Sequence, residues 1–496
     1  MKNKISHIVL WLLIFLGFSI ENKVFPQRTN ATIWPQFRGI NGSGIAQPDQ
    51  VSPVYLDSDE LLLWKSPVIT GESSPCIWGD RIFLTGFNTE NLQLHVMCYN
   101  RLNGRLIWKR RVPAKEIEPF HRSASPADGT PASDGERVYA HFGSYGLLCY
   151  DMDGNLIWDY KIPVNADKFG TGTSPILADN LVILMVRRLS TKERYLLALD
   201  KRNGEQVWKQ DLVEAGYSTP VIWRNDVVIH CEGFVAGYNV ENGSRSWNLL
   251  VRTHGESSPI VHDNTLYVNT WHFLGHYDFK KNIPELKEFL ETYDLNQDSR
   301  ISRKEFSGEL FMAGSPENET SSGTSTTAYG QIWGWFDVDK NDVLDRVELQ
   351  RYLNFFIAHD FGILAIRPTG AGEVSSNKIL WRGKENVAEV PSPLFYKGRI
   401  YVIKNGGYFS CAEAATGKFL YKERIKGTGP YFASPVAANN HIYVASHNGK
   451  LVVLEAGDEF KIVSETSFGE NILATPAIVD NKFYIRTSDH LYAFGD

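Results

Sequence analysis

The feature that most constrains the fold is a unit that occurs eight times along the 496 residues. Each unit has a Ser-Pro or Thr-Pro step, a short apolar strand, a polar turn and a second strand. The prolines are Pro75, Pro131, Pro175, Pro220, Pro259, Pro393, Pro435 and Pro476. Apart from one long gap, their spacing is 39 to 56 residues, the length of one four-stranded propeller blade. We therefore expect an all-β fold, an eight-bladed β-propeller.

A second marker lies in the back half of five units, where a turn glycine is followed four residues later by a large aromatic residue. Glycine supplies the positive φ that a hairpin turn needs. The pairs are Gly104 and Trp108, Gly154 and Trp158, Gly204 and Trp208, Gly243 and Trp247, and Gly417 and Tyr421. This regular position predicts that each aromatic side chain docks an outer hairpin against its neighbour.

The two ends of the repeat region predict a closed ring. Residues 61–65 form a single apolar strand ahead of the first unit, and the last unit ends at residues 491–494 with a third strand and no fourth. Pairing these two strands removes both open edges, which is how propellers avoid exposed strand edges.

These repeats resemble those of the pyrroloquinoline-quinone-like (PQQ-like) propeller proteins. The resemblance rests on the Gly-x-x-x-Trp strands and on residues 34–44, Trp-Pro-Gln-Phe-Arg-Gly-Ile-Asn-Gly-Ser-Gly, which look like the opening of secreted bacterial members. It covers about residues 34–271 and 360–496. The family includes quinoprotein dehydrogenases, which typically carry a vicinal Cys-Cys pair beside the quinone. The five cysteines of this chain are widely spaced, which argues against PQQ as a cofactor.

One long gap in the repeat indicates an inserted module. The step from Pro259 to Pro393 is 134 residues, and matching strands places the extra segment between Trp271 and Phe361. Residues 272–359 hold fifteen Asp or Glu and nine Lys or Arg, so they carry the whole formal charge of −6. We therefore divide the chain into a signal peptide (1–26), an N-terminal segment (27–57), a first propeller part (58–271), the insertion (272–359) and a second propeller part (360–496).

The insertion contains two twelve-residue loops with the spacing of calcium-binding EF-hands. Loop positions 1, 3, 5, 9 and 12 offer side-chain oxygens, and position 7 offers a backbone carbonyl, as a flexible calcium cage requires. The first loop supplies Asp294, Asn296, Asp298, Arg300, Ser302 and Glu305. The second supplies Asp337, Asp339, Asn341, Val343, Asp345 and Glu348. We expect two Ca²⁺ ions, with helices at about 284–293, 303–312, 326–336 and 347–358.

Two positions within the loops refine this expectation. Ile301 and Leu344, both at position 8, are placed to pair across the two loops. Position 6 is normally glycine because the turn needs a left-handed backbone, but here it is Ser299 and Asp342. Asp adopts that conformation more readily than Ser, so the first loop is the weaker predicted site.

Polar side chains mark one face of the predicted propeller. The loops that enter first strands and those that leave second strands open on the same face. The polar residues in the first set are Glu72, His121, Tyr217, His254 and Glu256. Those in the second set are His141, Arg187, His230, Trp271, Lys404, His447 and Arg486. The insertion leaves after Trp271, so we expect it on this face, and its aromatic residues, such as Trp333 and Phe336, to pack over or beside the channel mouth.

Two classes of function fit this pattern. We favour a binding or scaffold propeller for an unidentified protein or glycan, because no nucleophile–base spacing predicts catalysis. The alternative is a polysaccharide-active enzyme that uses His, Tyr and Arg groups at the mouth, with a PQQ-dependent oxidoreductase less favoured. The absence of a basic footprint excludes nucleic acid as a partner.

The amino terminus predicts export. Lys2 and Lys4 precede an apolar run at residues 8–20, which has the length of a signal-peptide core and is too short to span a bilayer comfortably. No later run is long and apolar enough for a transmembrane helix. We therefore expect a periplasmic or extracellular protein.

Overall fold

The computed structural model describes residues 32–495, except 58–59, 122–123, 166, 168, 189–190, 273–277, 280–285, 307–308, 314–324, 329–332, 335, 358–360, 369–370, 375 and 428. The predicted signal peptide lies outside the described residues. Within the described part of the chain, no helix is long and apolar enough to cross a membrane.

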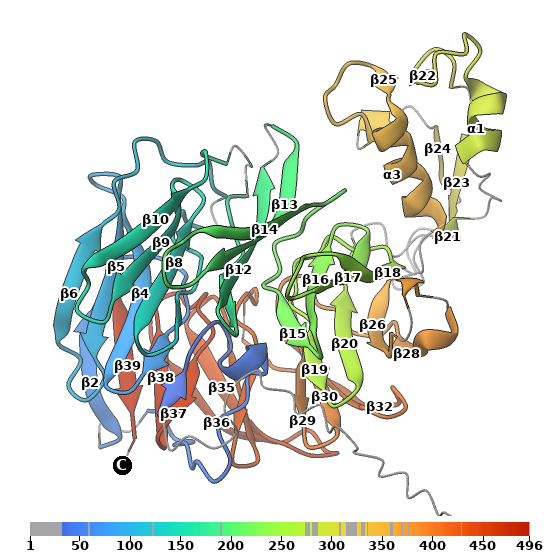
Figure 1. Ribbon diagram of the computed structural model, residues 1–496. Helices are drawn as coiled ribbons and strands as arrows, with labels where there is room; N and C mark the ends of the chain where they lie inside the picture. Colours follow the sequence, from blue (N-terminus) through green and yellow to red (C-terminus); the bar gives the residue numbers. More distant parts are fainter. Residues whose placement is uncertain are drawn as a thin grey trace, which may run out of the picture.

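Eight antiparallel sheets form a ring around a central axis, as the repeats predict (Figure 1). The first four blades contain β3 (Cys76–Trp78), β4 (Arg81–Asn88), β5 (Gln93–Asn100) and β6 (Leu106–Arg111); β7 (Ala132–Ser133), β8 (Arg137–Phe142), β9 (Gly146–Asp151) and β10 (Leu156–Lys161); β11 (Ile176–Ala178), β12 (Leu181–Arg188), β13 (Glu193–Asp200) and β14 (Gln206–Asp211); and β15 (Val221–Trp223), β16 (Asp226–Cys231), β17 (Phe234–Asn239) and β18 (Arg245–Leu250).

The other four blades continue the ring. They contain β19 (Ile260–His262), β20 (Thr265–Thr270), β26 (Gly362–Ile366) and β28 (Ile379–Gly383); β29 (Leu394–Tyr396), β30 (Arg399–Lys404), β31 (Tyr408–Glu413) and β32 (Phe419–Arg424); β33 (Val436–Ala438), β34 (His441–Ala445), β35 (Lys450–Glu455) and β36 (Ile462–Ser467); and β37 (Ala477–Val479), β38 (Lys482–Arg486), β39 (His490–Phe494) and β2 (Leu62–Pro67). The 3₁₀ helix η2 (Ser376–Lys378) precedes β28.

The ring closes where the sequence predicts. Strand β2 pairs antiparallel with β39, with Leu62 opposite Phe494 and Ser66 opposite Leu491. The last blade is therefore completed by a strand from the start of the chain, and the predicted closure is confirmed.

A closed ring of eight hydrogen bonds joins the blades at the axis. The hydroxyl oxygen of the Ser or Thr before each repeat proline accepts a hydrogen bond from the backbone N–H of the corresponding residue one blade earlier. These bonds are 2.9–3.1 Å long, and the last runs from Thr475 back to Ser74. We call these buried residues the hydroxyl ring: Ser74, Thr130, Ser174, Thr219, Ser258, Ser392, Ser434 and Thr475.

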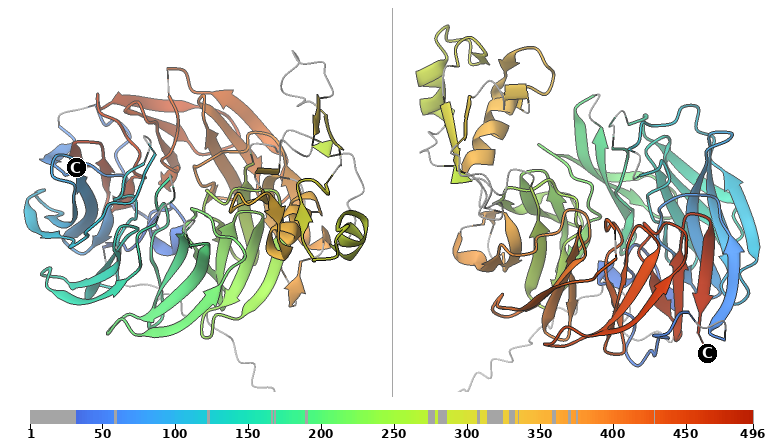
Figure 2. Two further views of the ribbon diagram at one scale, coloured as in Figure 1. Left: turned by 90° about the horizontal axis from the view of Figure 1, so that it is seen from above. Right: turned by 180° about the vertical axis from the view of Figure 1, so that it is seen from behind.

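The N-terminal segment lies across one end of the axis. Strand β1 (Ile33–Trp34) adds to β3, and the 3₁₀ helix η1 (Ile40–Gly42) lies in the middle of the ring (Figure 2, left). The side chain of Asn41 exchanges hydrogen bonds of 2.8 Å with Ile222, and the fully buried Arg38 donates to the carbonyl of Pro393 at 2.7 Å. Residues 33–46 therefore bind inner strands from several blades and close this end.

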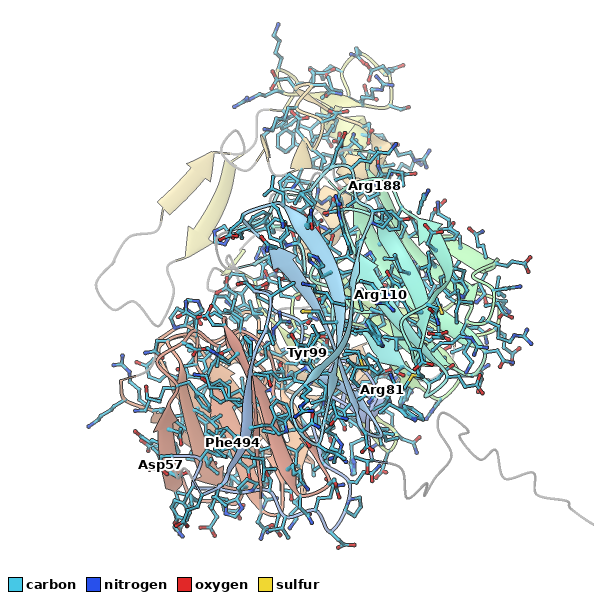
Figure 3. All side chains as sticks on the ribbon, turned by 90° about the vertical axis from the view of Figure 1, so that its left-hand side faces the viewer. Asp57, Arg81, Tyr99, Arg110, Arg188 and Phe494 are labelled. Carbon is cyan, nitrogen blue, oxygen red and sulfur yellow. The ribbon has the colours of Figure 1, made fainter. Side chains whose placement is uncertain are left out.

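Tryptophans dock neighbouring blades in a repeated contact. An outer-strand indole N–H donates to a turn carbonyl of the next blade and the ring lies against its turn glycine. The N–H bonds run from Trp64 to Arg101, Trp108 to Met152, Trp158 to Lys201, Trp208 to Val240 and Trp381 to Ala414, at 2.8–3.2 Å. Arg81 and Arg110, labelled in Figure 3, add bonds to the same turn that Trp108 contacts. The predicted docking role is confirmed for Trp108, Trp158 and Trp208.

Two aromatic residues meet the next blade differently. Trp247 donates to Asp226 of its own blade at 3.0 Å, because the next blade has a longer loop in place of the glycine turn. That loop supplies β27 (Gly372–Glu373), which pairs parallel to β18 with Gly372 beside Trp247. Tyr421 contacts the ring of Phe460 in the next blade, with 5.9 Å between centroids.

The segment between β20 and β26 stands on one face of the ring (Figure 1). It contains β21 (Asp278–Phe279), α1 (Leu286–Tyr293), β22 (Ile301–Ser302), β23 (Glu309–Ala313), β24 (Ser325–Ala328), β25 (Val343–Leu344) and α3 (Arg346–Ile357). Ile301 pairs with Leu344 between β22 and β25, as predicted. Helices α1 and α3 fall where helices are expected. The expected helix at 303–312 is wrong, and the one at 326–336 starts late, because β23 pairs with β24 as a hairpin. Residues 325–328 are Ser-Thr-Thr-Ala, and Ser and Thr are weak helix formers.

The blade-docking contact predicts that Gly204→Ala destabilises the protein more than Gly398→Ala. Both glycines have left-handed backbones, with φ of 75° and 77°, so both substitutions cost about 1–2 kcal/mol. A Cβ at Gly204 would lie 2.6 Å from Trp158, whereas a Cβ at Gly398 meets nothing within 4 Å. We expect about 1–3 kcal/mol of additional loss at Gly204. Urea unfolding measures this difference, and equal losses would contradict the docking account.

The hydroxyl ring predicts that Thr130→Val lowers the free energy of unfolding by about 1–3 kcal/mol, because the buried N–H of Ser74 loses its acceptor. Thr130→Ser keeps the oxygen and is the matched control. Thermal and urea unfolding of the two variants test this, and a Val variant as stable as the Ser variant would show that the ring contributes nothing.

Candidate ligand cavity and acidic loops

A cavity of about 1570 Å³ opens at the mouth of the ring. Its lining includes Phe37 of the N-terminal segment and four members of the hydroxyl ring, Thr219, Ser258, Ser392 and Ser434. It extends to Arg351 of α3 and to Phe336, a helical residue just before the second acidic loop. The closed end of the channel, the ring and the helical segment therefore bound one space.

The residues two positions before each member of the hydroxyl ring all line this cavity, because the ring holds the eight incoming loops in equivalent positions. We call them the mouth ring, in blade order Glu72, Asp128, Gly172, Tyr217, Glu256, Val390, Phe432 and Leu473. Apart from Gly172, which is exposed, they are half-buried. Three consecutive blades contribute apolar side chains, and the carboxylates come from the other blades. The mouth ring is therefore divided into a polar, acidic side and an apolar side.

The acidic side contains carboxyl groups that burial makes hard to ionise. Burial, with Glu72 close by, raises the pKa of Asp128 well above its usual range. Burial also raises the pKa of Glu256, and Glu389 and Glu232 add to this effect. The Oε2 atoms of Glu72 and Glu256 are buried and have no hydrogen-bond partner among the described residues.

A charged cluster lies beside this side of the mouth. Arg187 forms an ion pair with the buried Asp167 and donates to the Tyr217 hydroxyl at 2.6 Å. Tyr217 in turn donates to Asp167 at 2.7 Å, and the guanidinium lies 4.7 Å from the Tyr217 ring centre. Glu232 lies 3.7 Å from Arg187. The arginine is thus held by three neighbours within the cavity lining.

Charged contacts also attach the helical segment to the propeller. Arg351 of α3 forms ion pairs with Glu214 at 3.1 Å and Glu232 at 2.5 Å. Glu214, which is 7% exposed, also pairs with Arg194 at 2.8 Å. Lys192 reaches Asp339 at 3.1 Å. Ion pairs with blades three and four therefore hold the segment beside the mouth.

The aromatic residues expected to cover the mouth have another main role. Trp333 and Phe336 are buried in the segment's own core with Phe289, Phe306 and Tyr352. These rings pack there with Ile301, Leu344, Leu349 and Leu353, so they form the core of the segment itself. Phe336 also contributes to the cavity lining.

Eight of the twelve candidates for the ligand face line the cavity. They are Glu72, His121, Arg187, Tyr217, His254, Glu256, Trp271 and His447. His254 lies against Trp271 and His272, with ring centroids 5.5 and 4.4 Å away, and burial lowers its pKa.

The other four candidates lie outside the lining, and their surroundings explain why. His230 is fully buried and its ring nitrogens lie 2.7 Å from the Ser257 carbonyl and 2.6 Å from the Thr253 hydroxyl. His141 is also buried, which lowers its pKa to about 4. Arg486 is buried against Ser73, and Lys404 lies near the ring of Tyr408. These side chains serve contacts within and between blades.

The sequence interpretation missed several cavity carboxylates, namely Asp128, Asp167, Glu214, Glu232 and Glu389. Asp128 could have been found, because it has the same offset from Thr130 that Glu72 has from Ser74. The other four come from loops of different lengths, and the repeat assigns them no common position.

The two acidic loops have nearly the same internal hydrogen bonds. Asp294 and Asp337, at position 1, accept the N–H groups of positions 5 and 6 at 2.9–3.1 Å. The position-12 carboxylates, Glu305 and Glu348, accept the N–H of position 9 at 2.8 and 3.1 Å. Position 6 is left-handed in both loops, with φ of 62° at Ser299 and 60° at Asp342. Both loops therefore fold around their first and last carboxylates.

The second loop brings three carboxylates together. Oxygens of Asp337, Asp339 and Glu348 all lie within 4.8 Å of one another. Burial raises the pKa of Glu348, and the nearby carboxylates of Asp345 and Asp339 also contribute. Such a group could hold a cation.

Comparison with known families identifies the propeller. The family described as outer membrane protein assembly factor BamB matches residues 53–190, 154–272 and 362–459, well over half of the chain. The chain belongs to this family of PQQ-like propellers. The matches omit the segment between β20 and β26. No curated protein matches the sequence.

Solved structures are similar in fold. A europium-containing methanol dehydrogenase has a TM-score of 0.60 and 9% identity, over 94% of this chain and 98% of the other. The quinohemoprotein alcohol dehydrogenase from Comamonas testosteroni has a TM-score of 0.56 and 10% identity, over 94% and 80%. BamB from Moraxella catarrhalis has 13% identity and a TM-score of 0.48, over 90% and 97%. The first two likenesses show the eight-bladed fold.

The ion pairs of α3 predict that Arg351→Leu lowers the free energy of unfolding by about 3 kcal/mol, because it leaves the buried Glu214 and the half-buried Glu232 short of a partner. Arg346→Leu, at an exposed position of the same helix, is the control and should change stability by less than about 0.5 kcal/mol. Calorimetric unfolding compares the two, and equal effects would contradict a structural link through Arg351.

Proposed function

We propose that this chain is an exported calcium-binding propeller that binds a protein or glycan ligand in the cavity at its mouth. The proposal rests mainly on one observation: a pair of loops with EF-hand spacing is joined by ion pairs to the rim of a large cavity. The signal peptide at residues 1–26 and the division at 272–359 are part of this proposal.

The calcium part of the proposal follows from the donor set. Each loop offers carboxylates at positions 1 and 12 and further oxygens at 3, 5 and 9, the hard ligands that Ca²⁺ takes. The paired position-8 residues, Ile301 and Leu344, couple the two loops. The carboxylates repel one another without a cation, so binding would relieve this repulsion.

Calcium would also influence the cavity. Arg351 follows Glu348, the last ligand of the second loop, by less than one turn of α3. A cation that fixes Glu348 would hold the start of α3, and with it the Arg351 contacts to Glu214 and Glu232. We infer that calcium stabilises one position of the segment beside the mouth.

The cavity suits a binding role without PQQ. PQQ carries three carboxylates, whereas the lining has nine carboxylates against five Lys or Arg side chains. Arg187, Arg194 and Arg351 are already paired with carboxylates. The five cysteines are each buried and unbonded to one another, so they offer no vicinal pair at the cavity. These residues do not fit the quinone.

The calcium proposal predicts that isothermal titration finds two sites, with Glu348→Gln weakening binding more than Glu305→Gln. The second loop should be tighter because Asp342 tolerates its left-handed backbone better than Ser299 does. Glu291→Gln, on the exposed face of α1, is the control. Absence of binding at millimolar calcium would refute both sites, and equal effects of the two substitutions would refute the ranking.

A further inference from the structure

The mouth ring carries an asymmetry that bears on the identity of the ligand. Val390, Phe432 and Leu473 come from three consecutive blades and form an apolar side. Glu72, Asp128 and Glu256 come from the remaining blades. A ligand that contacts both sides must present an apolar surface and a group that complements carboxylates.

The charges of the lining define that group. Arg187, Arg194 and Arg351 form ion pairs with Asp167, Glu214 and Glu232, so these charges are largely balanced within the protein. Among the described residues, Glu72, Asp128, Glu256 and Glu389 form no ion pair with a Lys or Arg. The cavity therefore has an excess of acidic groups, and three of these four belong to the acidic side of the mouth ring.

Two of these carboxylates have unused hydrogen-bonding capacity. Oε2 of Glu72 and Oε2 of Glu256 are buried, line the cavity and lack a partner among the described residues. A buried acceptor without a donor costs roughly 1–3 kcal/mol, and more when it is charged. Ammonium and guanidinium groups supply both the donors and the positive charge.

The size of the cavity favours a polypeptide over a small amine. About 1570 Å³ exceeds the roughly 300–1,000 Å³ typical of small-molecule pockets. It could accommodate several neighbouring side chains. The space also reaches from the mouth ring to α3, so an extended segment could contact both.

We propose that the mouth ring binds a polypeptide segment in which Lys or Arg lies next to apolar side chains. Its cationic groups would bind at the acidic residues Glu72, Asp128 and Glu256, and its apolar groups would pack against Val390, Phe432 and Leu473. This inference rests on the proposed binding function and names its ligand. The negative lining excludes acidic segments, and a neutral glycan would leave the buried carboxylates without a charged partner.

Selection from a phage library of random twelve-residue peptides tests the proposal. The full-length mature protein is used with millimolar calcium, and bound sequences are compared with the unselected library. We expect enrichment of Lys or Arg adjacent to Leu, Phe or other apolar residues. Recovery of no binding peptide, or of peptides without this enrichment, would overturn the proposal.

Variants locate the binding to the mouth ring. Synthetic versions of the selected peptides should bind Glu256→Gln and Glu72→Gln at least tenfold more weakly than the parent protein. Leu473→Asn should also weaken them, because it places an amide on the apolar side. Glu241→Gln, at an exposed position of the turn between β17 and β18 that does not line the cavity, is the control and should bind normally. Equal binding by Glu256→Gln and Glu241→Gln would assign the peptides to another surface.

Two further measurements distinguish this inference from the calcium proposal and from binding of other kinds of ligand. Unfolding temperatures confirm that each Gln variant is folded. Repeating the titrations with EDTA tests whether peptide binding needs calcium. Binding that still depends on the carboxylates and is unchanged by EDTA supports the peptide site, and it contradicts the proposed effect of calcium on the cavity. Phenethylamine or a neutral cello-oligosaccharide that binds more tightly than the peptides, with the same variant dependence, would overturn the polypeptide assignment.

Discussion

The hydroxyl ring is the interaction on which the rest of the structure depends. Eight backbone N–H groups at the axis would be buried without acceptors if each neighbouring blade did not supply a hydroxyl. Each donor and its acceptor belong to different blades, so every bond fixes one blade relative to the next. Because the bonds form a closed cycle, they also fix the eight incoming loops, and the mouth ring two residues away occupies equivalent positions around the cavity.

The inserted segment leaves this cycle intact. The N–H of Ser258 donates to the hydroxyl of Ser392 at 2.9 Å, although 134 residues separate them in sequence. The insertion leaves after β20, whose Asn269 accepts a hydrogen bond from Ser257, and returns in β26 of the same blade. Long surface insertions cost little closure entropy. A helical segment can therefore be placed beside the mouth through Arg351 without disturbing the ring that shapes the cavity.

Much of this fold could be predicted from the sequence, because repeats report the same environment eight times. Each recurring pattern has a single structural reason. The Ser/Thr-Pro steps form the hydroxyl ring, the turn glycines with their aromatic residues dock the blades, and the two end strands close the ring. Features without a repeat were harder to predict. The expected helix at 303–312 is instead partly strand β23, and the carboxylates Asp167 and Glu232 come from loops of unrelated length. His230 and His141 are polar residues of the kind that contact ligands, but both are buried by packing that a single repeat does not reveal.

The central claim is that calcium at the acidic loops acts on the cavity through α3. Hydrogen exchange of the full-length mature protein, with calcium and with EDTA, tests it most directly. The account predicts that calcium slows exchange in residues 286–357 and also in the propeller loops that carry Glu214 and Glu232, which contact Arg351. Slower exchange confined to residues 286–357, or no change in either region, would contradict the account.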